Sequence, residues 1–122
     1  MDPVDVPPVV IALVRDLMFS SKISSTCRAM GIPVKIVRDA AGLGSQAAQC
    51  LLVDLHLEGA LMAAVQWQKA VGNPVLAFAK HTDTDVITAA RKAGIERVVA
   101  RSGFEAALPT VLQEAAARVS KG

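Results

Sequence analysis

Short apolar runs alternate with longer segments of helical character along this chain. Because each run is followed by such a segment, the alternation predicts a parallel sheet with helices on both faces and right-handed crossovers. Five runs indicate a three-layer α/β/α domain with strand order 2-1-3-4-5. The predicted strands cover residues 9–14, 34–37, 51–55, 75–78 and 97–100.

The helices are predicted from apolar residues that recur at helical spacing between the strands. The second helix, over residues 43–49, is short and weakly marked. Two patterns that resemble capping boxes, Thr82-x-x-Asp85 and Ser102-x-x-Glu105, predict where the last two helices begin. Pro109 should lie in the first turn or so of the last helix, or that helix is kinked.

The length of 122 residues indicates one domain, residues 9–120, after an extended lead-in at residues 1–8. A hydrophobic fraction of 52% excludes a disordered chain. A net charge of +2 and an aromatic fraction of 3% do not indicate nucleic-acid binding. The apolar runs are too short to span a membrane. Cys27 and Cys50 are expected to be reduced and buried in a cytoplasmic protein.

Asp54 ends an apolar run and is predicted at the carboxyl edge of the sheet, where open α/β sheets carry their chemistry. Residues 51–59, LLVDLHLEG, resemble the phosphoacceptor strand and following turn of the receiver domains of two-component response regulators. Residues 74–81 resemble the family's fourth strand, Ala93-Gly94 the end of its fourth helix, and residues 101–104 its Lys-Pro-Phe segment. The resemblance spans residues 9–119 and implies the flavodoxin-like fold and a role in bacterial phosphorelay signalling.

The metal-binding part of this resemblance is altered. A working receiver holds Mg²⁺ with two acids at the end of its first strand, where this chain has Arg15 and Asp16. A guanidinium group repels Mg²⁺ and does not lose its proton. Arg15 could instead pair with Asp54 or Asp16 in place of the metal. We therefore expect no cofactor, with Mg²⁺ as the open alternative.

The switch positions of the family are altered as well. The Ser or Thr whose hydroxyl meets the phosphoryl group is Ala79, and the aromatic residue of the fifth strand is Val98. The family's Lys is Arg101, and the Pro after it is Ser102. Phosphoryl transfer depends on positioning and charge neutralisation, so these changes work against it.

Two acids therefore have competing interpretations. Asp54 is either a phosphoacceptor or half of a structural ion pair with Arg15 or Arg101, and we favour the ion pair because a partly buried carboxylate needs a partner. Asp16 is either a metal ligand or the N-cap of the first helix, and we favour the cap.

A possible anion site combines the hydroxyls of Ser20 and Ser21 with the cation of Lys22 near a helix amino end. Lys80 and His81 extend the cationic candidates at the predicted sheet edge. A flavin platform is hard to build because the chain has no Tyr and one Trp. A solvent-facing polar helix side is the simpler interpretation of the serines.

No Ser–His–Asp, CxxC or HxxE constellation is present, so we do not expect an enzyme, and His56 and His81 are interpreted as exposed loop histidines. The favoured hypothesis is a degenerate pseudo-receiver that acts by protein–protein contact without ordinary Asp phosphorylation. Its partner would be a kinase, an output protein, a scaffold or a second copy in a homodimer. The alternatives are an atypical receiver phosphorylated on Asp54 and a flavodoxin-like binder of a small anion or nucleotide.

Overall fold

The computed structural model describes residues 9–95 and 97–121, the last four of them as backbone only. Within them, five parallel strands form one sheet in the order β2-β1-β3-β4-β5, which confirms the predicted fold class. The predicted lead-in, residues 1–8, lies outside the described residues. The strands are β1 (Val10–Leu13), β2 (Val34–Val37), β3 (Cys50–Asp54), β4 (Val75–Ala79) and β5 (Arg97–Ala100).

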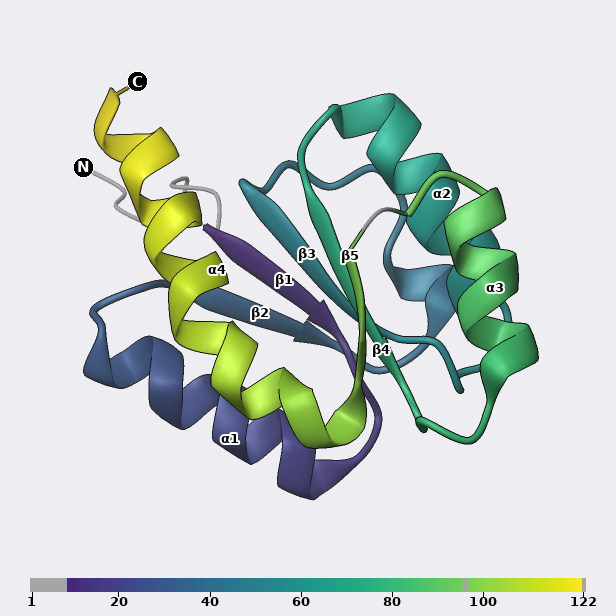
Figure 1. Cartoon of the computed structure of the whole chain (residues 1–122). Helices are drawn as coiled ribbons and strands as arrows, with labels where there is room; N and C mark the ends of the chain where they lie inside the picture. Colours follow the sequence, from purple (N-terminus) through teal and green to yellow (C-terminus); the bar gives the residue numbers. More distant parts are fainter. Residues whose placement is uncertain (1–8, 96, 122) are drawn as a thin grey trace.

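The helices cover both faces of the sheet, which gives the predicted three layers. Helices α1 and α4 lie on one side, and α2 and α3 lie on the other (Figure 1). Their bounds are Leu17–Ala29 for α1, Ala60–Val71 for α2, Thr84–Lys92 for α3 and Arg101–Lys121 for α4.

The central strands β1, β3 and β4 are buried along their whole length, as the nearly pure apolar runs predict. Successive residues of each strand face opposite sides, so the sheet separates two cores. Trp67 of α2 is the largest fully buried side chain on one side, and Phe78 and Phe104 fill the other.

The helix predicted over residues 43–49 is absent. The connection from β2 to β3 contains only a 3₁₀ turn, η2 (Ala40–Gly42). Tertiary contacts fix the conformation of this connection instead. Leu43 is fully buried, and the Trp67 indole N–H donates to the carbonyl of Gln46 at 2.8 Å. Gly44 adopts a left-handed φ of 53°, which a regular helix does not accommodate.

Both predicted capping boxes are wrong. The N-cap of α3 is Asp83, one residue after Thr82, and its side chain makes no capping bond. Helix α4 begins at Arg101, directly after β5, so Ser102 lies inside the helix. Pro109 therefore lies well past the first turn of α4. Because α4 starts directly at the end of β5, Ser102 and Pro109 both lie further into the helix than predicted.

Among the described residues neither Cys27 nor Cys50 forms a disulfide, and both are buried, as predicted. Burial raises the pKa of the Cys27 thiol to about 11, because the thiolate would lose its hydration. Within the described chain, no helix has the length and apolar character needed to cross a membrane.

Candidate functional site

Asp54 is the centre of the carboxyl edge of the sheet. It is the last residue of β3, and only 4% of it is exposed. Its Oδ1 accepts a hydrogen bond from the backbone N–H of His56 at 3.0 Å. A carboxylate with so little access to water needs a second partner to offset its lost hydration.

Arg101 is that second partner. Its Nη2 lies 3.1 Å from Asp54 Oδ2, and 28% of its side chain is exposed. Of the two arginines that the sequence offered to Asp54, the structure pairs it with Arg101. The guanidinium carbon also lies 4.7 Å from the ring centroid of Phe19, at cation–π distance. The buried Nε of Arg101 has no hydrogen-bond partner among the described residues.

Three phenylalanines form the floor under this ion pair. Phe78 of β4 is the sheet neighbour of Asp54, and its ring centroid lies 4.2 Å from that of Phe104 in α4 and 5.1 Å from that of Phe19 in α1. The apolar floor excludes water from one side of Arg101. An ion pair in such surroundings is screened less than a surface pair.

Arg15 and Asp16 do not join this pair. Arg15 is exposed, and within the described part of the chain it makes no hydrogen bond or ion pair. The Asp16 carboxylate instead caps α1, where Oδ1 accepts from the N–H of Met18 at 2.8 Å and of Phe19 at 3.2 Å. The expectation that Arg15 takes the metal's place beside Asp54 or Asp16 is therefore wrong, because the chain directs Arg15 into solvent.

The described side chains at this edge do not gather into a metal site. Among residues 9–95 and 97–121, no three His, Cys, Asp or Glu side chains gather closely enough to hold an ion. Asp16 and Asp54 have their carboxylates committed to backbone N–H groups, and Asp54 also to a cation. The donor set therefore fits a hard divalent ion poorly.

Asp16→Ala should lower the free energy of unfolding by about 1 kcal/mol, because α1 loses its N-cap. Asp16→Asn keeps an accepting oxygen and should cost only a few tenths of that. Urea denaturation of both variants provides the measurement. If Asn proves as harmful as Ala, the negative charge of Asp16 has a role other than capping.

The switch-equivalent positions contain no relay of the expected kind. Ala79 is fully buried in the core on the α2–α3 side and has no hydroxyl to offer. Val98 is 7% exposed and belongs to the same core. Ser102 is exposed on the first turn of α4. Of this group, Arg101 alone reaches Asp54.

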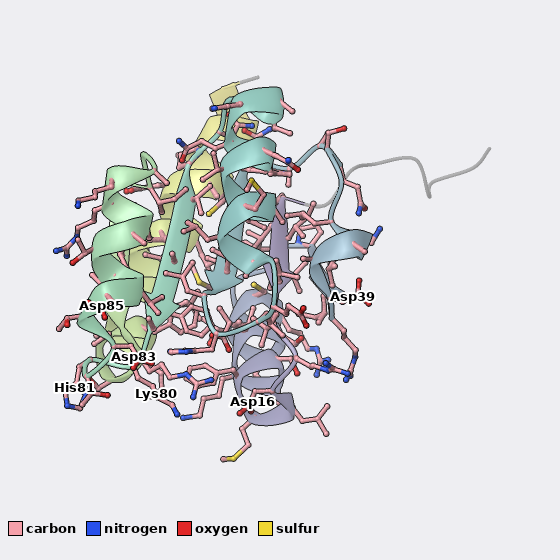
Figure 2. All side chains as sticks on the ribbon, turned by 90° about the vertical axis from the view of Figure 1, so that its right-hand side faces the viewer. Asp16, Asp39, Lys80, His81, Asp83 and Asp85 are labelled. Carbon is pink, nitrogen blue, oxygen red and sulfur yellow. The ribbon has the colours of Figure 1, made fainter. Side chains whose placement is uncertain are left out.

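The residues proposed for an anion site are dispersed. Ser20 and Ser21 line a groove of about 450 Å³ with Arg28 and Arg38, on the β2 side of α1. Lys22 forms an ion pair with Glu105 of α4 instead. Figure 2 shows Lys80 and His81 at the lower end of the molecule, in the turn before α3. The two sets do not form one site.

His56 is the site residue that the sequence interpretation missed. Its side chain is 26% exposed, but its Nε2 accepts a hydrogen bond from the backbone N–H of Lys80 at 2.9 Å. The same atom lies 3.4 Å from Asp83 Oδ2. The sequence gives the position of His56, in the turn directly after Asp54, but it does not mark the backbone N–H that is its partner.

No known family model matches this sequence, and no curated protein does either. Solved structures with a similar fold include response regulators and receiver domains. Full-length FixJ from B. japonicum is 17% identical with a TM-score of 0.73, over 91% of this chain and 58% of that chain. A CheY-like receiver domain protein from Methanospirillum hungatei JF-1 is 12% identical with a TM-score of 0.76, over 96% and 100%.

A third solved structure has a similar fold. It is a response regulator protein from Burkholderia pseudomallei with a phosphorylated aspartic acid, a calcium ion and citrate. It is 16% identical with a TM-score of 0.70, over 92% of this chain and 70% of that chain. This chain therefore has the fold of response-regulator receiver domains, and it spans little more than half of full-length FixJ.

Proposed function

We propose that this chain is a degenerate receiver module that signals by protein–protein contact without ordinary phosphorylation of Asp54. The Asp54–Arg101 ion pair is the observation that carries the proposal. It gives a buried carboxylate a permanent cation from within the chain. Phosphoryl transfer to Asp54 would require that carboxylate as a free nucleophile with a metal ion beside it.

Three further features support the proposal. The Asp16 carboxylate is occupied at the amino end of α1, and Arg15 is exposed in the place of the family's other acid. Ala79 offers no hydroxyl through which a phosphoryl group could draw in the β4–α3 loop. The carboxyl edge of the sheet thus has the layout of a receiver domain. It lacks the acid pair that would bind the metal for phosphorylation and the hydroxyl that would respond to the phosphoryl group.

An atypical receiver that is phosphorylated on Asp54 is the second candidate. It is favoured by the place of Asp54 at the end of β3 and by the cation of Arg101 where the family has Lys. In that case Arg101 would have to leave Asp54 Oδ2 and turn to the new phosphoryl group.

Incubation with a small phosphodonor and Mg²⁺, followed by intact-mass measurement, separates these two functions. We expect no phosphoryl gain on the wild type, because Arg101 occupies Asp54 and no acid pair holds the metal. Asp54→Asn is the matched control, and a competent receiver treated in parallel verifies the donor. Gain of one phosphoryl group by the wild type, lost in Asp54→Asn, would refute the degenerate module.

The partner of such a module would be another protein, a kinase, output protein or scaffold, or a second copy of this chain. The apolar side chains of α4 at Val111, Leu112 and Ala115 are already buried in the core. A homodimer through the α3–β5–α4 face would therefore use the exposed residues of these elements.

A further inference from the structure

We infer that the His56 imidazole is a built-in latch that joins the β3–α2 loop to the β4–α3 loop without any phosphoryl group. The latch uses the neutral ring, with its proton on Nδ1 and the lone pair of Nε2 accepting from Lys80. This inference rests on the proposed function only for its consequence in signalling. The contacts themselves stand independently of it.

The latch is a chain of three contacts. Asp54 Oδ1 accepts from the N–H of His56 at 3.0 Å, which fixes the first loop to the carboxylate. His56 Nε2 then accepts from the N–H of Lys80 at 2.9 Å, across 24 residues of sequence. The carbonyl of Lys80 in turn accepts from the N–H of Asp83 at 2.9 Å. The buried acid is thereby connected to the turn that starts α3.

The contact between His56 and Lys80 lies just past the end of the β3–β4 ladder. The last backbone bond of this ladder runs from the N–H of Leu55 to the carbonyl of Phe78 at 3.0 Å. Beyond that point the two strands continue into separate loops, and the Lys80 N–H has no strand to pair with. Lys80 is exposed, so water is the alternative partner of this N–H, and the bond to His56 orders the loop rather than satisfying a buried donor. The His56 ring makes this bond one residue past the end of β4.

Two contacts compete for the same ring nitrogen. Nε2 cannot accept from Lys80 and also donate to Asp83 Oδ2, which lies 3.4 Å away. The distance to Lys80 is within the range of a true N–H···N or N–H···O bond, whereas 3.4 Å to Asp83 is beyond it. The bond to Lys80 therefore determines the tautomer, and Asp83 is a near neighbour without a hydrogen bond to Nε2.

The consequence follows from Ala79, the residue before Lys80. With no hydroxyl there, the loop has no group that a phosphoryl on Asp54 could pull inward. His56 connects the same two loops without a phosphoryl group. In a module of the proposed kind, the latch holds the β4–α3 loop in one position for its partner.

The test compares His56→Leu, which removes the acceptor, with His56→Gln, whose amide oxygen reaches about as far as Nε2. Native-state hydrogen exchange of the Lys80 amide should quicken roughly fivefold to tenfold in His56→Leu, the effect of losing one hydrogen bond, and stay near the wild-type rate in His56→Gln. The Leu55 amide, bonded to Phe78, is the internal control and should not change. Equal Lys80 exchange in the wild type and His56→Leu would overturn the latch.

Imidazole ¹⁵N chemical shifts at neutral pH give a second readout. We expect His56 as the neutral Nδ1–H tautomer. The Nε2–H tautomer, or an imidazolium paired with Asp83, would overturn the inference. The outcome is separable from the proposed function: a protected Lys80 amide in a chain whose Asp54 accepts phosphoryl would retain the latch and reject the degenerate module.

Discussion

Arg101→Met should lower the free energy of unfolding by about 2–4 kcal/mol at neutral pH. The substitution leaves the Asp54 carboxylate, 4% exposed, with a single backbone donor and no counter-charge. Breaking a fully buried ion pair costs roughly 3–5 kcal/mol, and we expect somewhat less here because 28% of the Arg101 side chain meets solvent. Urea denaturation followed by circular dichroism measures the change.

The double variant Asp54→Asn with Arg101→Met is the control for this effect. It removes both charges together, so it should be within about 1 kcal/mol of the wild type, more stable than Arg101→Met alone. Asp54→Asn alone should cost less than Arg101→Met, because Arg101 can turn toward water. Additive effects of the two substitutions would mean that the pair does not stabilise the buried acid.

Phe78→Ala should lower the free energy of unfolding by about 3–5 kcal/mol, as for other large buried aromatic residues. Phe78 is fully buried, and its ring contacts Phe19 and Phe104. Removal leaves a cavity below Arg101 and deletes the ring on β4 against which Phe19 of α1 and Phe104 of α4 pack. Thermal or urea unfolding of the variant gives the value directly.

Phe78→Leu keeps most of the apolar volume and should cost no more than about 1.5 kcal/mol. The difference in free energy of unfolding between the two variants therefore measures what the apolar side chain contributes to the floor of the site, apart from any effect on β4. A loss below 1 kcal/mol for Phe78→Ala would show that the phenylalanine cluster rearranges freely to fill the space.

The strands and their order could be predicted because each central strand is apolar along nearly its full length. A strand buried on both faces has a composition that few other elements share. The same reasoning predicted Asp54 at the carboxyl edge of the sheet, because this residue ends one of the apolar runs. The prediction of a helix over residues 43–49 was wrong. Small residues and glycines give this segment only a weak helical periodicity, and the hydrogen bond from Trp67 to the Gln46 carbonyl helps to fix another conformation.

The contacts of the site could not be read from spacing. Arg101 lies 47 residues from Asp54, and Arg15 was an equally acceptable partner because the predicted strand order brings both arginines to the same edge of the sheet. The histidine after Asp54 was given no role because its partner is a backbone N–H, which every residue but proline has. The caps failed for a related reason, since α4 begins where β5 ends rather than at Ser102.

The central claim is that an internal guanidinium, rather than a divalent ion, neutralises Asp54. A crystal structure from crystals soaked in Mg²⁺ and a phosphoryl analogue tests it most directly. We expect Arg101 Nη2 on Asp54 Oδ2, the Asp16 carboxylate on the amino end of α1, and no ion between them. A Mg²⁺ ion bound between Asp16 and Asp54, with Arg101 withdrawn, would contradict the account.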